Sequence, residues 1–419
     1  MTARLFPSQR LSGKIAAPAS KSDAHRALIA AALADAPTRI CLSEFCEDTR
    51  ATLNCLTALG AGFSYDGGVL TVTPKKGGAQ KPVLDCGESG STLRFLLPVA
   101  AALGADATFL GRGRLPDRPI LPILSELSAH GTLADAEKLP LTLNGRLCGG
   151  EFTLPGNLSS QFISGLLFAL PLTGEACRIR VTGGLESAAY INMTLAVLKS
   201  FGVLWQKTTD GFALPAGQAY KSPTEYTVEG DFSGASFFLV SGALGGDVEI
   251  SNLGKTSLQA DRAILDALRL AGAEVTESAQ GIRVRGGGLT PFSFDVSGCP
   301  DIFPILAILA CGAEGKSHLY GAARLRLKES DRIDTTAKML RALGVTVEEH
   351  ADALSIYGKG RLTGGDVDGA NDHRIVMAAA VATALCDAPV SISDAEAVAK
   401  SYPAFFKDYQ TLGGVCSGI

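Results

Sequence analysis

The stretch Leu-Asn-Cys-Leu-Thr-Ala-Leu-Gly-Ala, residues 53–61, is the first of six that decide the fold. Its apolar residues at i, i+3 and i+4 predict an amphipathic helix, and Gly60 can adopt the left-handed conformation that caps such a helix. Close variants of this pattern end at Gly131, Gly202, Gly272, Gly344 and Gly413. Successive glycines are 71, 71, 70, 72 and 69 residues apart, so the sequence predicts six copies of one α/β unit.

A second helix is expected in each copy. The six segments are 21–34, 89–103, 157–170, 231–244, 300–312 and 371–385. They are apolar almost all round and rich in small residues, which predicts burial, and each begins with polar residues suited to a helix N-cap. Short alternating segments such as 68–74 and 281–286 are typical of strands. We therefore expect an α/β fold whose helices are buried and whose sheets lie outside them.

Length and composition limit the classes of protein that remain. A chain of 419 residues is too long for one core, and three repeats make a domain of ordinary size, so two domains are expected. A net charge of −4 gives no general attraction to nucleic acid or membranes. No apolar run reaches the roughly 18 residues of a membrane span, and the first residues lack a signal peptide, so a cytoplasmic protein is expected. None of the ten cysteines forms a CxxC pair, which favours buried, reduced thiols over a metal site or disulfides.

The charged residues of interest lie at or beside the starts of the predicted buried helices. If those helices run parallel within a domain, their N-termini and the positive ends of their dipoles meet on one face, which suits an anionic ligand. Each motif alone has an ordinary explanation: a solvated helix start around Lys21 and Arg26, a surface ion pair for Arg118, or a capping box at Ser159. All of these motifs lie at the same position within the repeat, however, which favours a shared binding face. Glu329 lies among cations that can keep it ionised or position it as a proton donor.

Several motifs in this order resemble the 5-enolpyruvylshikimate-3-phosphate synthase family. They are KSxxHRAL (21–28), GxSGSTxR (87–94), DRPI (117–120), SSQF (159–162), YIxMTL (190–195), VEGDxS (228–233), KESDR (328–332), NDHR (371–374) and KxYP (400–403). The resemblance implies two inside-out α/β barrels, each of three βαβαββ repeats, joined by a double crossover near residues 18 and 229. One domain would comprise 1–18 and 229–419 and the other 19–228, with the active site in the cleft between them.

The resemblance also implies roles for individual residues. Shikimate 3-phosphate would be held by Lys21, Ser22, Arg26, Ser159, Ser160, Gln161, Ser187, Tyr190, Asp301 and Lys328. Phosphoenolpyruvate would be held by Lys21, Gly90, Arg118, Gln161, Glu329, Arg332, His373, Arg374 and Lys400. The expected catalytic residues are Asp301 as base, Glu329 as acid, and Lys21. Neither a metal nor an organic cofactor is expected. The protein is expected to be a monomer.

Some positions depart from the family pattern, and two other functions remain to be considered. Glu88 stands where Asn is common, Arg324 where Asn often contacts substrate, Ala188 where Lys is frequent, and Ser401 where Thr is. One alternative is UDP-N-acetylglucosamine enolpyruvyl transferase, which typically has Lys-Asn where this chain has Lys21-Ser22. The other is a non-catalytic ring clamp with sixfold repeats, which should carry Lys and Arg along its helices rather than only at their starts.

Overall fold

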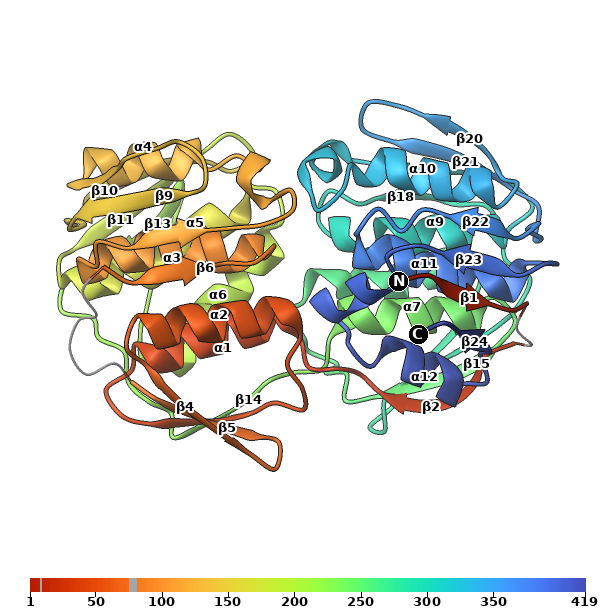
Figure 1. Ribbon diagram of the computed structural model, residues 1–419, viewed down its shortest axis with the longest axis horizontal. Helices are drawn as coiled ribbons and strands as arrows, with labels where there is room; N and C mark the ends of the chain where they lie inside the picture. The colour runs from red at the N-terminus through yellow and green to blue at the C-terminus, as the bar shows by residue number, and fades with distance from the viewer. Residues whose placement is uncertain (8–9, 75–80) are drawn as a thin grey trace. The chain divides into compact units, whose positions relative to one another are not determined.

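The computed structural model describes residues 1–7, 10–74 and 81–419, and its contacts divide the chain into two units (Figure 1). Unit 1 contains Met1–Ser20 and Glu229–Ile419, and unit 2 contains Lys21–Val228. The chain therefore leaves unit 1 after Ser20 and returns to it at Glu229. Within the described ranges, no helix is both long enough and apolar enough to cross a membrane.

The described residues of unit 2 form three four-stranded sheets and six α-helices. The first sheet has the order β14 (Glu225–Thr227), β3 (Thr38–Cys41), β5 (Val69–Thr73), β4 (Gly62–Asp66). The second is β6 (Val83–Asp85), β7 (Thr108–Leu110), β9 (Leu141–Gly145), β8 (Thr132–Ala134), and the third is β10 (Gly150–Pro155), β11 (Cys177–Thr182), β13 (Gly211–Leu214), β12 (Gln206–Thr208). The helices are α1 (Lys21–Ala32), α2 (Glu47–Ala58), α3 (Gly90–Leu103), α4 (Leu121–Ala129), α5 (Ser160–Ala169) and α6 (Ala188–Ser200).

The described residues of unit 1 form the same number of sheets and α-helices. Its sheets are β16 (Glu274–Glu277), β17 (Ile282–Arg285), β15 (Asp247–Ser251), β2 (Ser12–Ala16); then β18 (Ser293–Asp295), β19 (Gly315–Tyr320), β21 (Leu354–Gly358), β20 (Thr346–Glu349); and β22 (Gly365–Val367), β23 (Val390–Ile392), β1 (Ala3–Leu5), β24 (Cys416–Ser417). Its helices are α7 (Phe232–Ala243), α8 (Ile264–Leu270), α9 (Phe303–Cys311), α10 (Arg332–Ala342), α11 (His373–Ala382) and α12 (Phe405–Thr411).

One topological pattern recurs in all six sheets. A parallel pair of strands, such as β10 with β11, is followed by antiparallel neighbours, here β13 and then β12. Parallel neighbours need a crossover helix, whereas antiparallel neighbours can be joined by a tight turn. Three strands come from distant parts of the chain: β14 pairs with β3, β2 with β15, and β1 with β23 and β24.

The glycine prediction is confirmed at every repeat. Gly60, Gly131, Gly202, Gly272, Gly344 and Gly413 all have positive φ, between 79° and 103°. The second predicted helix of each repeat is also buried along most of its length, as in α3, α9 and α11. Because these helices are enclosed on nearly every side, their sequences lack the polar face of a surface helix.

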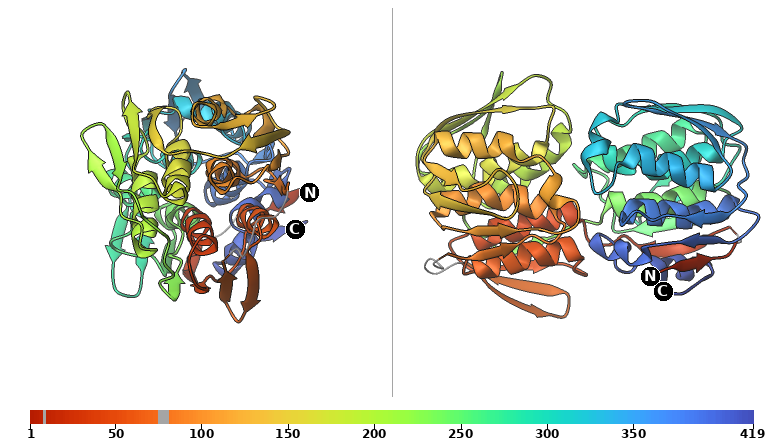
Figure 2. Two further views of the ribbon diagram at one scale, coloured as in Figure 1. Left: turned by 90° about the vertical axis from the view of Figure 1, so that its left-hand side faces the viewer. Right: turned by 45° about the horizontal axis from the view of Figure 1, so that its top comes forward.

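The buried helices of unit 2 pack closely against one another, and the strands of that unit lie outside them (Figure 2, left). A Cβ atom at Gly165 of α5 would lie 2.4 Å from the carbonyl oxygen of Arg94 on α3, so only glycine allows this approach. Phe95 and Phe168 add an aromatic contact between the same helices, with ring centroids 5.7 Å apart. This packing fixes α3 and α5 relative to each other, and with them the polar residues at their N-termini.

The two segments at which the chain enters and leaves unit 1 lie side by side. Ala19 and Gly230 form an antiparallel bridge, the Ser20 amide donates to the Glu229 carbonyl at 2.8 Å, and the Asp231 amide donates to the Pro18 carbonyl at 2.8 Å. The next residue after the first segment begins α1, and α7 begins at Phe232 just after the second.

The cysteines are free thiols, and seven of the ten are buried. They are Cys46, Cys55, Cys86, Cys177, Cys299, Cys311 and Cys386. Burial raises the pKa of the Cys311 thiol, which keeps it protonated and unreactive. The expectation that most cysteines are buried and reduced is confirmed.

Candidate functional site

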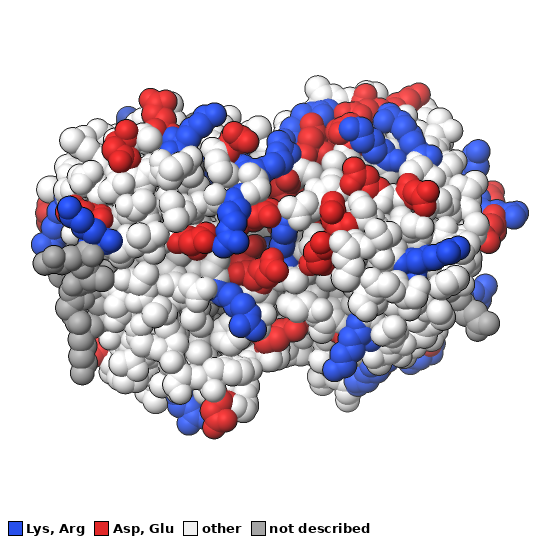
Figure 3. Space-filling model, viewed as in Figure 1, with Lys and Arg blue, Asp and Glu red and all other residues white. Residues whose placement is uncertain are grey.

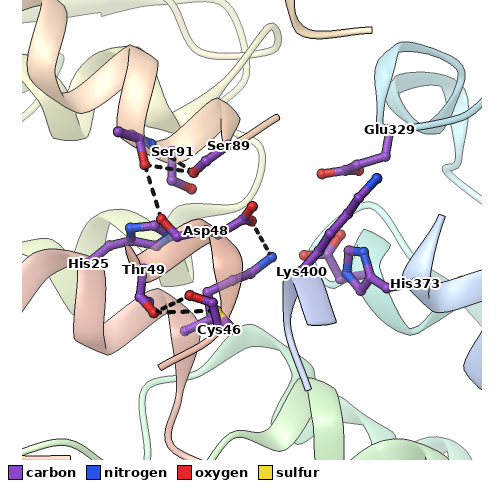
Figure 4. Close-up of polar contacts among 12 residues, drawn as sticks. His25, Cys46, Asp48, Thr49, Ser89, Ser91, Glu329, His373 and Lys400 are labelled. Atoms are coloured by element: carbon purple, nitrogen blue, oxygen red, sulfur yellow. Dashed lines mark hydrogen bonds and ion pairs between the residues drawn. The ribbon is translucent and has the colours of Figure 1, made fainter. Parts of the chain in front are cut away.

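Lys21, the first residue of α1, points toward the start of α2. Its Nζ lies 2.8 Å from Oδ2 of Asp48, and both side chains are largely buried. Figure 4 shows Asp48 beside Ser89 and Ser91 at the start of α3. Because helix N-termini carry partial positive charge, the gathered ends of α1, α2 and α3 form a positive region in which Asp48 balances Lys21.

Arg26 is held in position by three hydrogen bonds. Its Nε donates to Thr194 Oγ1 at 2.8 Å, while its Nη atoms donate to the carbonyls of Ser22 at 2.6 Å and Tyr190 at 3.0 Å. Burial is the main cause that lowers its pKa, to about 10, so the guanidinium remains charged at neutral pH. Arg26 thus joins α1 to α6 and provides a fixed buried cation.

His25 continues a chain of hydrogen bonds behind Lys21. Its Nδ1 lies 2.7 Å from Thr52 Oγ1, which lies 2.6 Å from Thr92 Oγ1, and Thr92 in turn donates to Ser89 Oγ at 2.8 Å (Figure 4). Burial, followed by Lys21 and Arg26, holds the pKa of His25 well below its ordinary value. A neutral His25 therefore links α1, α2 and α3 without adding charge.

Gly90 and Arg118 are in direct contact at the start of α3. A Cβ atom built on Gly90 would lie 2.7 Å from Nη1 of Arg118 and 2.9 Å from its Cζ, so the guanidinium lies over the glycine backbone. Arg118 follows a short 3-10 helix, Leu115–Asp117, and is largely buried. The DRPI segment thereby presents an Arg beside the helix N-terminus, where an anion would gain from both.

Gln161 connects α5 to α3. Its Oε1 accepts from Arg94 Nη1 at 2.8 Å and its Nε2 donates to Ser91 Oγ at 2.8 Å. Ser159 is the N-cap of α5 and accepts from the Gln161 amide at 3.3 Å. The SSQF motif therefore lies next to the glycine-rich turn of the preceding repeat.

Ser160, Ser187 and Tyr190 complete the predicted residues of unit 2. Ser160 starts α5 and is buried, and Ser187 is the N-cap of α6 with a φ of 53°. The left-handed conformation is uncommon for Ser, and such positions gather at functional sites. Tyr190 lies in the first turn of α6 and gives its carbonyl to Arg26.

In unit 1, Asp301 is surrounded by three cations. Its Oδ1 lies 2.8 Å from Arg332 Nη1 and 3.4 Å from Lys328 Nζ, and its Oδ2 lies 3.1 Å from Arg374 Nη2. Burial alone would raise the pKa of Asp301, but Arg374, Lys328 and Arg332 together lower it well below the ordinary value. This carboxylate is therefore ionised at neutral pH.

Arg332 is the centre of this cluster and is 1% exposed. Its Nε lies 2.8 Å from Asp372 Oδ2 and its Nη2 lies 2.7 Å from Glu329 Oε2, in addition to the contact with Asp301. Asp372 is also the N-cap of α11 and accepts from the Arg374 amide at 3.0 Å. One buried guanidinium thus ties together the starts of α9, α10 and α11.

Lys400 and His373 lie close to this cluster. Lys400 Nζ donates to the Asn371 carbonyl at 2.7 Å, which attaches the last predicted residue to the start of α11. Figure 4 shows the side chains of Glu329, His373 and Lys400 in the same part of unit 1. His373 and Arg374 are both buried in the first turn of α11.

Two of the four residues that depart from the family pattern, Arg324 and Glu88, have identifiable surroundings. Arg324 donates to the Ser297 carbonyl at 2.7 Å, within unit 1. Glu88 lies against Gly113, where an added Cβ would come within 2.6 Å of the Glu88 carboxyl carbon. Nothing in these contacts explains why Glu and Arg replace the more common Asn.

Some charged side chains on the surface of unit 1 form ion pairs. On the face of unit 1 seen in Figure 3, side chains of both signs lie over α10 and β20. On α10, Lys338 pairs with Asp334 at 2.7 Å, and Lys316 of β19 pairs with Glu348 of β20 at 3.1 Å. Within the described part of the chain, no group of three or more His, Cys, Asp or Glu side chains is arranged to hold a metal ion.

Three residues of these clusters were absent from the predicted site. Asp48 pairs with Lys21, Arg94 binds Gln161, and Asp372 binds Arg332. Arg94 could have been found, because it lies one helical turn after Gly90 in the GxSGSTxR motif. Asp372 was interpreted only as a cap, and no sequence signal identified Asp48.

Comparisons with known proteins identify the family of this chain. Residues 5–409 match the EPSP synthase (3-phosphoshikimate 1-carboxyvinyltransferase) family. The chain is 41% identical to a 3-phosphoshikimate 1-carboxyvinyltransferase of Clostridium kluyveri, over 97% of this chain and 96% of that protein. A corresponding protein of Methanocorpusculum labreanum is 38% identical, over 96% of this chain and 97% of its own.

Solved structures give the same result. An EPSP synthase from Acinetobacter baumannii has a TM-score of 0.84 and 27% identity, with 99% of each chain covered. A two-domain α/β fold is therefore confirmed, and the match of nearly the whole sequence shows the ancestry. The chain belongs to the EPSP synthase family.

Proposed function

We propose that this enzyme transfers the enolpyruvyl (carboxyvinyl) group of phosphoenolpyruvate to the 5-hydroxyl of shikimate 3-phosphate. The products are 5-enolpyruvylshikimate 3-phosphate and phosphate, in a step of the shikimate pathway toward chorismate and the aromatic amino acids. The observation that carries this proposal is the cluster of Asp301, Lys328, Arg332 and Arg374 in a chain that matches the family from residue 5 to 409.

Residues of both units would bind the substrates. Shikimate 3-phosphate would contact Ser22, Arg26, Ser159, Ser160, Gln161, Ser187 and Tyr190 of unit 2, with Asp301 and Lys328 of unit 1. Phosphoenolpyruvate would contact Lys21, Gly90, Arg118 and Gln161 of unit 2, with Glu329, Arg332, His373, Arg374 and Lys400 of unit 1. Both substrates are anions, and the fixed cations of each cluster suit them because preorganised charge costs no reorganisation during the reaction.

The reaction would proceed by addition and elimination. Asp301, which its cations keep ionised, accepts the proton of the 5-hydroxyl as that oxygen attacks C2 of phosphoenolpyruvate. Glu329 delivers a proton to the methylene carbon, and Arg332 at 2.7 Å keeps its carboxyl group in place. The tetrahedral adduct then loses phosphate as the methylene forms again and a proton returns to the enzyme. Lys21 would stabilise charge on the phosphate that leaves.

The remaining proposals concern architecture and setting. Each unit would be an inside-out α/β barrel of three βαβαββ repeats, joined by a double crossover near residues 18 and 229. The domains would be 1–18 with 229–419, and 19–228. Buried helices surrounded by three sheets in each unit support this arrangement. The protein would act as a cytoplasmic monomer, without a metal or organic cofactor and without binding nucleic acid or membranes.

A phosphate-release assay tests the activity. Purified protein with phosphoenolpyruvate and shikimate 3-phosphate should release phosphate and form one enolpyruvyl product, seen by mass spectrometry. The same reaction with UDP-N-acetylglucosamine in place of shikimate 3-phosphate is the control and should release none. Activity with the UDP sugar alone would refute the assignment.

A further inference from the structure

Asp261 is a buried carboxyl group that the proposed reaction does not use. It lies in the 3-10 helix η3 (Ala260–Ala263) and is 1% exposed. The Ser233 hydroxyl, in the first turn of α7, donates to its Oδ2. Its Oδ1 is buried and has no hydrogen-bond partner among the residues that the structure describes.

Three elements pack against η3, namely α7, α8 and the short helix η4 (Pro300–Ile302). From α7 and its N-cap come Ser233 and Asp231, and from η4 comes Asp301. Arg374, which contacts Asp301 at 3.1 Å, is the nearby cation that acts on Asp261. Asp261 therefore lies close to the cluster proposed to bind phosphoenolpyruvate.

The other charged groups around η3 are occupied elsewhere. Arg262, on η3 itself, lies 2.7 Å from Glu277, and Asp266 of α8 is exposed and lies 3.5 Å from Arg269. The thiol of Cys299, which precedes η4, is uncharged because burial raises its pKa. Among the residues that the structure describes, Arg374 is thus the cation that favours the ionised form of Asp261.

A buried carboxylate with one unbonded oxygen is costly, and a proton removes that cost. Burial first, and then Asp301, raise the pKa of Asp261 to about 7, while Arg374 and the Ser233 hydroxyl oppose the rise. At neutral pH the group is therefore close to half protonated. The charge on Asp261 therefore changes in a pH range in which the charges on Asp301 and Arg374 stay constant.

We propose that Asp261 is a positioning residue that gains and loses a proton and thereby sets the charge around Asp301 and Arg374. Protonated Asp261 leaves the positive charge of Arg374 available to an anion. Ionised Asp261 competes with that anion and weakens the binding of phosphoenolpyruvate. This effect rests on the proposed function of Arg374, whereas the proton on Asp261 does not.

The Michaelis constant for phosphoenolpyruvate, measured from pH 6 to 8, tests the effect on binding. The ratio of the wild-type constant to that of Asp261→Asn cancels the ionisation of the substrate itself. We expect this ratio to rise by about three- to tenfold between pH 6 and pH 8, because one buried charge is added near Arg374. Asp266→Asn, which changes an exposed aspartate on α8, should show no such pH-dependent ratio.

Ser233→Ala supplies a second test that retains Asp261. It removes the hydrogen bond that favours the ionised carboxylate, so the inflection should move to higher pH. A wild-type to Asp261→Asn ratio that is constant with pH would overturn the proposal. If Asp261→Asn does not fold, the pH dependence of the Michaelis constant in Ser233→Ala decides instead. An inflection at the same pH as in the wild type would overturn the proposal.

Carbon-13 NMR of aspartate-labelled protein separates this inference from the reaction. One carboxyl resonance should titrate close to pH 7 in the wild type, be absent in Asp261→Asn, and titrate higher in Ser233→Ala. Absence of that resonance from the wild type would refute the inference even in an active enzyme. Loss of the phosphate-release reaction, with the resonance present, would refute the proposed function instead.

Discussion

Replacing Gly90 with alanine places a methyl group against the guanidinium of Arg118. The new Cβ would lie 2.7 Å from Nη1, 2.9 Å from Cζ and 3.0 Å from Nη2. Non-bonded contacts of this kind settle near 3.5 Å, so the guanidinium must retreat by about 0.5–1 Å. The colliding atoms are the end of a long side chain, and Gly90 is already helical, so the fold should accommodate the change.

The expected effect is on substrate binding. A retreat of this size lengthens and bends any hydrogen bond from Arg118 to phosphoenolpyruvate. Hydrogen bonds to charged groups are worth about 1.5–3 kcal/mol, which corresponds to roughly a 10- to 100-fold rise in the Michaelis constant for phosphoenolpyruvate. The turnover number should change far less, because Gly90 and Arg118 take no part in the proposed proton transfers by Asp301 and Glu329.

Steady-state kinetics with each substrate varied in turn would measure this split, and thermal unfolding would check the fold. Gly288→Ala is the matched control, since Gly288 is exposed and no atom lies within 4 Å of its added Cβ. An unchanged Michaelis constant for phosphoenolpyruvate in folded Gly90→Ala would refute the assigned position of Arg118. A fall in turnover alone would point to a different role for this helix start.

Two further substitutions test the buried cluster of unit 1. Glu329→Gln keeps the shape but removes the transferable proton, so turnover should fall by about 10²- to 10⁴-fold while calorimetry still detects binding of both substrates. Asp372→Asn removes the most deeply buried of the three carboxylates that pair with Arg332 and should lower the free energy of unfolding by about 3–5 kcal/mol at pH 7, measured with denaturant. Burial alone would raise the pKa of Asp372, but Arg332 and His373 lower it. Its stabilisation is therefore complete above the unfolded pKa near 3.9 and disappears as the pH falls through the folded value.

Each of these tests has a comparison within the same chain. Asp387→Asn removes the partner of Arg361 in an exposed pair, so stability should hardly change. Equal losses in Asp372→Asn and Asp387→Asn would contradict the importance of the buried pair. Wild-type turnover in Glu329→Gln would remove Glu329 from the mechanism.

The sequence predicted the repeating helices well because their signals are local. A glycine after an apolar helix and a polar N-cap before one can each be recognised from a few neighbouring residues. The positive φ of Gly202 and Gly344 follows directly from the first of these signals. The pairing of β14 with β3 could not be predicted in this way. These strands are three and four residues long and lie far apart in the chain.

The candidate site shows the same limit. Motifs identified Lys21 and Arg332, but their partners Asp48 and Asp372 lie 27 and 40 residues away and are chosen by packing. The sequence did not identify Asp261 as a buried residue, because a single Asp in an amphipathic segment resembles any surface residue. Only its burial beside Asp301 distinguishes it.

The bridge between Ala19 and Gly230 has a consequence for engineering the gene. The Ser20 amide donates a hydrogen bond to the Glu229 carbonyl, so the residues that flank the 208-residue insert Lys21–Val228 are in direct contact. Excising it would leave two ends that a very short splice can rejoin, without stretching β2 or α7. Compact segments with neighbouring ends tolerate excision and circular permutation well. Each half of this enzyme could therefore be produced as a separate protein, and the contribution of each half to the binding of a given substrate measured by direct titration.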